Sequence, residues 1–244
     1  MKKTILTIGV ISTLLFTGCY NENKAQNTQQ PISKKSKKDV MSNYRAVPAS
    51  KATILQKGDQ KMYCPVCGMT LPLFYRTNHA ASHNGYDKQY CSIHCAAQDK
   101  EVNKKMLANF RVVDNDTLEF IDSNDAFFVV GSKKPGTMST VSKYAFGTQE
   151  SAKEFKNRFG GKVMKFSELY ILVKESLKDD IKKVEAKQTM AAKKGSMIYK
   201  KMCKQIDTKF ESVSQAKAYI KKNKICGNLK GKKLQMVGLY LGKE

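Results

Sequence analysis

Two closely spaced pairs of cysteines constrain this sequence more than any other feature. The first pair, Cys64 and Cys67, forms the segment CPVC. The second pair, Cys91 and Cys95, lies in the segment YCSIHC. Each pair presents two sulfur atoms from one tight turn, and the intervening chain can fold the pairs together. The spacing therefore predicts a site that holds a metal ion through four thiolates. Two disulfides are the alternative in an oxidising compartment.

Other side chains that bind soft metal ions lie near these cysteines in the sequence. Met69 follows Cys67 by two residues, and His94 lies inside the second pair. Thiolate and thioether ligands together select Cu(I), whereas thiolates alone suit zinc equally well. Met69 therefore favours copper, with zinc as the alternative, and His94 is a further candidate ligand. We expect His79 and His83 to be surface histidines of a loop, because polar residues and a glycine surround them.

The N-terminus resembles a bacterial lipoprotein signal. Two lysines precede an apolar stretch from Ile5 to Phe16, which is too short for a stable membrane-spanning anchor, and small residues lead to Cys19. We expect residues 1–18 to be removed and Cys19 to carry lipid, which anchors the chain on the periplasmic side of a bacterial membrane. Tyr20 follows Cys19 in place of the aspartate that commonly retains lipoproteins at the inner membrane, so the outer membrane is preferred.

The charge of the chain is strongly positive. It carries 44 Lys+Arg against 21 Asp+Glu, a formal net charge of +23. Such a charge indicates nucleic acid or anionic lipid as a partner. Chromosomal DNA is absent outside the cytoplasm, so we predict no nucleic-acid partner and a solvated surface that tolerates anionic headgroups. Residues 19–50 are polar and cannot bury enough surface to offset their ordering entropy, so we expect a flexible tether.

The pattern after the cysteines favours an α+β fold. The runs Thr117–Ile121 and Ala126–Val130 are β-branched or aromatic and flank a polar turn, which predicts a hairpin. A helix is expected to begin after Thr148 or after Ser151 and to end at a pair of glycines. A strand over Lys162–Phe166 follows them. Strand, hairpin, helix and strand in this order are typical of an α+β domain.

The last part of the chain is expected to be helical. Apolar residues recur at helical spacing from Glu168 to about Ala192, and Gly195 is expected to end this helix. The tail is similar to the first and last helices of a class I cytochrome c, but it lacks the CxxCH sequence that attaches heme. We expect Cys203 and Cys226 to form one disulfide. The expected parts are residues 1–18, 19–50, 51–168, 169–194 and 195–244.

Residues from Tyr63 to about Glu168 resemble the NosL family, the copper-binding lipoproteins that are accessory to nitrous oxide reductase. The shared features are the CGM sequence that begins at Cys67, the YCSIHC segment, the apolar run AFFVVGS, the PGTM turn that ends in Met138, and the segment GGKVMKFSEL. The cysteine segments are also similar to treble-clef-like metal modules of copper- and heavy-metal-handling proteins.

The resemblance implies a fold of ββαβ-type units related to organomercurial lyase. It also implies Cu(I) binding mainly through Cys67 and Met69, with Met138 as a further ligand. Cys64, Cys91 and Cys95 together depart from the simplest pattern of the family, so the exact ligand set stays open. The implied partners are the apo nitrous oxide reductase and the periplasmic subunit of the associated ABC transporter complex.

Three functional classes follow from these observations. The first is a lipid-anchored Cu(I) metallochaperone, which binds and transfers its ion without turnover and is not an enzyme. The second is a docking or assembly factor with a structural zinc site. The third is a dithiol redox protein, which is disfavoured because no convincing strand precedes Cys64 as a thioredoxin-type motif requires.

Overall fold

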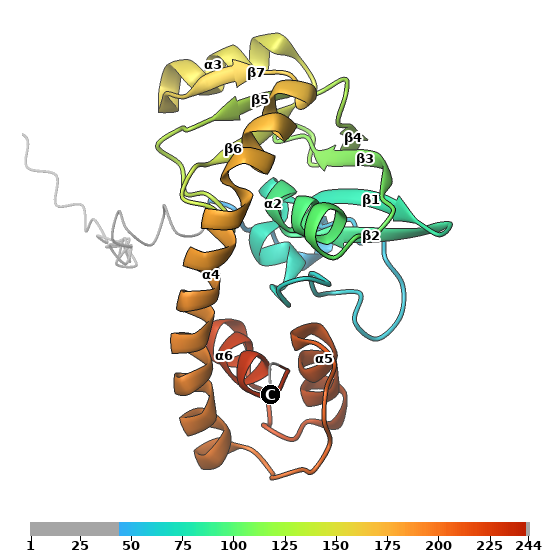
Figure 1. Cartoon of the computed structure of the whole chain (residues 1–244), viewed down its shortest axis with the longest axis vertical. Coiled ribbons are helices and arrows are strands. Elements are labelled where there is room, and N and C mark those ends of the chain that lie inside the picture. The colour runs from blue at the N-terminus through green and yellow to red at the C-terminus, as the bar shows by residue number, and fades with distance from the viewer. Residues whose placement is uncertain (1–43, 243–244) are drawn as a thin grey trace, which may run out of the picture. The chain divides into compact units, whose positions relative to one another are not determined.

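The computed structural model describes residues 44–242 (Figure 1). Residues 1–43 lie outside the described residues. They include the expected signal peptide and Cys19, the expected site of lipidation. Among the helices that are described, none is long and apolar enough to cross a membrane. Two β-sheets occupy the N-terminal part of the described chain, and long helices follow them, so the α+β prediction is confirmed.

The first sheet consists of four strands, β1 (His79–His83), β2 (Tyr86–Tyr90), β3 (Ala108–Val113) and β4 (Phe120–Asp122). Their order is β2-β1-β3-β4, and each neighbouring pair is antiparallel. The turn between β1 and β2 is Asn84-Gly85, and both residues have positive φ angles, of 50° and 78°. Asn-Gly is the residue pair that tolerates this conformation in a two-residue hairpin.

The second sheet consists of three strands, β5 (Phe127–Val130), β6 (Lys143–Phe146) and β7 (Lys162–Met164). β5 lies in the centre and pairs antiparallel with both neighbours. The predicted hairpin over 117–121 and 126–130 is therefore wrong, because β4 pairs with β3 and β5 pairs in the other sheet. The turn between them, in which the Asp122 carboxylate accepts from the backbone N–H of Asn124, carries the chain from one sheet to the next.

Helix α3 (Gln149–Phe159) begins after Thr148, which is one of the two expected N-cap residues. The side chain of Thr148 accepts a hydrogen bond from the backbone N–H of Ser151. The alternative start after Ser151 is wrong, because that residue already lies in the first turn. Gly160 follows the helix with a φ angle of 75°, a conformation that glycine adopts without strain. The predicted strand follows as β7 and ends at Met164.

Helix α4 (Phe166–Met202) runs from the sheets to the C-terminal helices (Figure 1). The prediction that this helix ends at Gly195 is wrong, because Gly195 lies within it. A Cβ atom at Gly195 would lie 1.9 Å from the backbone oxygen of Met236, so the glycine lets the backbone of another helix approach closely. The remaining helices are α5 (Val213–Asn223) and α6 (Gly231–Leu241).

Residues 44–50 pack against the domain, although the sequence assigns them to the tether. The backbone N–H of Val47, which is buried, donates to the oxygen of Pro72 at 3.0 Å. The ring of Tyr44 meets that of Tyr144 edge-on, with centroids 5.4 Å apart. Tyr44 and Val47 explain the difference, because each buries apolar surface against the domain. The residues before them in the sequence are mostly polar and offer little apolar surface to bury.

Two hydrophobic clusters hold the helices. The first joins all four cysteines of the two pairs to the first half of α4 through Leu169, Val173 and Leu177. The second packs Tyr199, near the end of α4, against residues of α5 and α6 such as Ile220. α4 therefore belongs to both clusters. The short helices are η1 (Ala49–Lys51), η2 (Leu71–Thr77), α2 (Ile93–Ala97) and the π-helix η3 (Gln98–Val102).

Candidate metal centre

The structure brings the two cysteine pairs together. The Sγ atoms of Cys64, Cys67, Cys91 and Cys95 all lie within 4.8 Å of one another. The Cys67 and Cys91 sulfur atoms are 3.4 Å apart, and those of Cys91 and Cys95 are 3.7 Å apart. A tetrahedral ion with metal–sulfur bonds of about 2.3 Å has sulfur–sulfur edges of about 3.8 Å. The donor set therefore fits one tetrahedral thiolate-bound ion.

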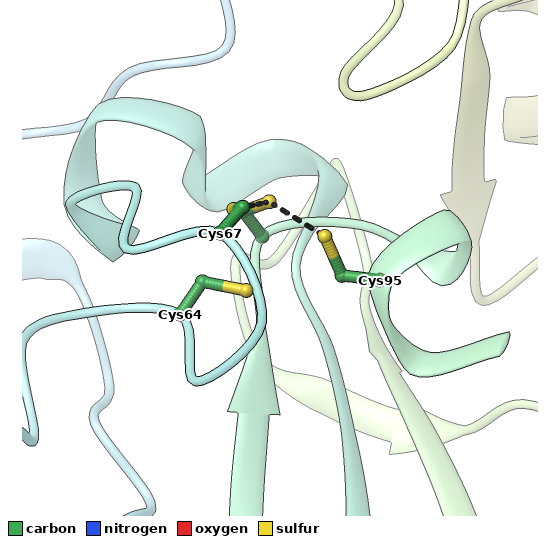
Figure 2. Close-up of side chains that lie close together, drawn as sticks. Cys64, Cys67 and Cys95 are labelled. Atoms are coloured by element: carbon green, nitrogen blue, oxygen red, sulfur yellow. Dashed lines mark hydrogen bonds between the residues drawn. The ribbon is translucent and has the colours of Figure 1, made fainter. Parts of the chain in front are cut away.

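Figure 2 shows the side chains of Cys64, Cys67 and Cys95 converging from two segments of the chain. None of the four cysteines forms a disulfide in the structure, and all four are buried. The disulfide alternative for the two pairs is thus absent from the described fold. Cys203 and Cys226, in contrast, are joined by a disulfide near the end of α4.

Backbone hydrogen bonds shape the turn that carries the first pair. The N–H of Gly68 donates to the oxygen of Cys64 at 2.8 Å, and the N–H of Cys64 donates to the oxygen of Met69 at 2.9 Å. Gly68 has a φ angle of 70°, which the closed turn requires. The turn thus fixes both cysteine side chains on one side of the loop.

The second pair is positioned by the junction of β2 and α2. Cys91 directly follows β2, and the hydroxyl of Thr77 donates to its backbone oxygen at 2.8 Å. Cys95 lies in α2, and Ser92 caps this helix by accepting from the backbone N–H of Cys95. A strand end and a capped helical turn therefore hold the second pair opposite the first.

The electrostatics of the cluster favour ionisation of Cys64 over that of Cys91 and Cys95. Burial opposes ionisation of Cys64, but hydrogen bonds from Cys67, Cys91 and Cys95 hold its pKa well below the usual value. Burial raises the pKa of Cys91 well above the usual value, and the Cys64 thiolate adds to this effect. The neighbouring thiols, Cys64 first, also raise the pKa of Cys95. A metal ion must therefore displace protons from the cluster as it binds.

The histidines lie outside the four-sulfur cluster. His94, a candidate ligand, is 2% exposed, and its Nδ1 atom lies 3.9 Å from a carboxylate oxygen of Asp180. Burial lowers the pKa of His94 to about 4, so its ring is neutral at pH 7. The loop expected at His79 and His83 is wrong, since both lie in β1. His79 is buried and stacks on Phe128.

The structure places the two candidate methionines beside a cavity. Met69 and Met138 both line a cavity of about 320 Å³, together with Met236 of α6. Both also pack in the hydrophobic cluster that contains the four cysteines. Met138 has a φ angle of 58°, a conformation that a side chain with a Cβ atom rarely adopts. The sequence offered no signal for Met236, because only the tertiary crossing of α4 and α6 brings it near.

The two cysteine pairs and Met69 lie within a segment that matches a known protein family. Residues 56–172 match the model of the NosL family. This segment is therefore similar to the NosL family. The expected resemblance over about 63–168 is thus confirmed, and the match ends within the first part of α4. The rest of α4, with α5 and α6, lies beyond the NosL match.

One similar solved structure is the copper chaperone NosL from Shewanella denitrificans. It is 22% identical in sequence, and the match covers 50% of this chain and 96% of that chain, with a TM-score of 0.38. Among curated protein sequences, none matches this chain significantly.

Proposed function

We propose that this chain is a Cu(I)-binding metallochaperone rather than an enzyme. The observation that carries the proposal is the group of four buried sulfur atoms within 4.8 Å of one another, inside the segment that matches the NosL family. Thiolates are soft ligands that bind Cu(I) as well as zinc, and a thioether beside them favours Cu(I). Met69 supplies such a thioether two residues after Cys67 in the same turn.

Transfer of the ion requires ligands that a partner can replace one at a time. The four cysteines are buried, whereas Met69 is half-buried and borders the cavity that Met138 also lines. We infer that the cavity is the route by which a partner's sulfur ligands approach. Met69 would be the ligand on this route, because it follows Cys67 by two residues and lines the cavity.

We propose the destination of the copper from the resemblance to NosL. The chain would supply Cu(I) for maturation of the metal centres of nitrous oxide reductase, with the apo enzyme and the periplasmic subunit of the associated ABC transporter complex as partners. Lipid on Cys19 would anchor it on the periplasmic side of a bacterial membrane, with preference for the outer membrane. In this proposal the protein would act in denitrification.

The second candidate function is docking or assembly around a structural zinc site. One observation favours it: all four thiols are buried, and no cysteine lines the cavity beside Met69. Closed sites with four protein ligands are typical of structural zinc, whereas an exchangeable ion needs an accessible position.

An anaerobic Cu(I) titration against a chromogenic competitor tests the proposal. The protein begins after Cys19, and wild type is compared with Cys67→Ser and with a Cys64, Cys91 and Cys95 triple serine variant. We expect the wild type to bind Cu(I) tightly. We expect the Cys67→Ser variant to lose this binding. Cu(I) binding that is absent from the wild type, with zinc retained, would support the structural role instead.

A further inference from the structure

A buried lysine from the C-terminal helices reaches the cysteine turn. Lys217 of α5 is 0% exposed. Its Nζ atom donates to the backbone oxygen of Gly68 at 2.5 Å, to the hydroxyl of Thr70 at 3.1 Å and to Oε1 of Gln235 at 2.7 Å. The same ammonium group lies 4.3 Å from the centroid of the Tyr63 ring. These four partners are neutral groups.

No carboxylate balances this charge. None of the ion pairs found between residues 44 and 242 includes Lys217. A buried cation without a charged partner destabilises the fold, so proteins place an opposite charge nearby. Burial lowers the pKa of Lys217 to about 7, and the nearby cysteine side chains, Cys67 first, oppose this effect.

The occupied cysteine cluster supplies the missing negative charge. Four thiolates outweigh the positive charge of one Cu(I) or one Zn(II) ion, so the metal-bound cluster is anionic. We propose that Lys217 is a positioning residue of the metal centre, whose ammonium group offsets this negative charge and holds the turn that carries Cys64 and Cys67. The proposal rests on the proposed function in one respect, namely that the cysteines bind a metal ion.

Further contacts from both C-terminal helices fix the same turn. The Nε2 atom of Gln235, on α6, donates to the backbone oxygen of Cys67 at 2.9 Å. A Cβ atom at Gly68 would lie 2.3 Å from Cγ1 of Val213, so α5 packs directly on the turn. Gly238 leaves room for the lysine, since a Cβ atom there would lie 2.4 Å from Cγ of Lys217.

These helices lie beyond the NosL match, which ends at residue 172. The chain therefore completes its metal centre with residues from outside the NosL match. This gives α5 and α6 a role that neither the NosL match nor the cytochrome-like sequence pattern of the tail assigns.

The test is Co²⁺ binding to the reduced chain that begins after Cys19, followed anaerobically by the thiolate-to-metal absorption. Lys217→Met removes the charge, and Lys217→Gln removes it while retaining hydrogen-bond donors. Lys222→Met is the matched control, because Lys222 lies on the same helix, is exposed and pairs with Asp59. Gln235→Leu removes a bond to the turn and one acceptor of Lys217 without changing the formal charge. Circular dichroism and urea unfolding show which variants fold.

We expect both Lys217 variants to bind Co²⁺ roughly tenfold more weakly, because a nearby cation stabilises the thiolate form. The pH of half-maximal Co²⁺ binding should rise by roughly one unit in both, since metal binding displaces thiol protons. Lys222→Met should match wild type in both measurements. Gln235→Leu should weaken binding and leave the pH midpoint unchanged.

Two results would overturn the proposal. The first is an unchanged pH midpoint in the Lys217 variants, which would make the lysine a purely structural contact. The second is unchanged Co²⁺ affinity in Lys217→Gln. If the wild-type cysteines bound no Co²⁺, this result would contradict metal binding and therefore the proposed function. The Lys217 variants, in contrast, test only the role of the lysine.

Discussion

The Sγ atom of Cys67 lies 3.4 Å from that of Cys91, although the hairpin of β1 and β2 separates the two residues in the chain. This contact joins the turn that Gly68 closes to the strand end that precedes α2. One ion at this point would link the two segments, so metal binding should stabilise the domain as well as serve transfer.

The thioethers should distinguish copper from zinc. Met69→Leu combined with Met138→Leu keeps the apolar volume but removes two soft ligands. We expect Cu(I) binding to weaken by roughly tenfold or more, while Zn(II) binding through the four thiolates stays unchanged. Competition with a Cu(I) chelator and a Zn(II) chelator measures both affinities. Met190→Leu with Met197→Leu is the control, since these methionines on α4 are 60% and 63% exposed. Equal losses for both ions would contradict the thioether assignment.

The close crossing of α4 and α6 should make Gly195 intolerant of substitution. Alanine favours a helix by about 1 kcal/mol over glycine, but a Cβ atom here meets the backbone of Met236. We expect Gly195→Ala to lower the free energy of unfolding by about 1–3 kcal/mol, as overpacking does. Urea unfolding measures the change. Lys194→Ala, at the exposed neighbouring position, should be nearly neutral, and a stabilised Gly195→Ala would show that the helices do not approach this closely.

The disulfide should stabilise the C-terminal helices without affecting the metal centre directly. Replacing Cys203 and Cys226 by serine opens a loop whose ends are separated by 23 residues. In the chain-entropy model this costs on the order of 3 kcal/mol. Denaturant unfolding of the double variant should show the loss, and a Zn(II) titration should still give one ion per chain. An unchanged unfolding midpoint would mean that the disulfide contributes nothing to stability.

His79 should make stability depend on pH. Burial lowers its pKa from 6.5 to about 4, so the folded state holds the neutral ring. Below pH 6.5 the unfolded chain binds a proton that the folded chain does not, so the stability of the wild type falls with pH and levels off below about 4. The advantage of wild type over His79→Gln should therefore shrink by up to about 3 kcal/mol between pH 7 and pH 4. A difference that is constant over this range, in urea unfolding at each pH, would contradict the assignment.

The cysteine site was predictable because its information is local. Two tight turns each present two sulfur atoms, and two such pairs at this separation are typical of a metal site. The cap at Thr148 and the glycine that ends α3 are also local signals, and the structure contains both. Met69 was a candidate from its position after Cys67, and the NosL resemblance supplied Met138; the structure places both at one cavity.

The features that the sequence did not reveal depend on distant partners. The run that forms β4 looks like half of a hairpin, and only the position of β3 decides its pairing. Gly195 resembles a helix end unless α6 crosses at that residue. Lys217 resembles any other lysine of a basic helix, and its burial follows from the packing of α5 against the cysteine turn. Periodicity within one segment carries none of this information.

Displacement of zinc by copper distinguishes a copper chaperone from a protein with a structural zinc site. The protein that begins after Cys19 is loaded with one Zn(II) ion and then given one equivalent of Cu(I) without oxygen, and native mass spectrometry identifies the bound ion. A Cu(I) chaperone should release zinc and retain one copper ion, and the Cys67→Ser variant should not retain copper. Zinc that stays bound in the wild type, with copper left to a competing chelator, would contradict the account and identify the four cysteines as a structural zinc site.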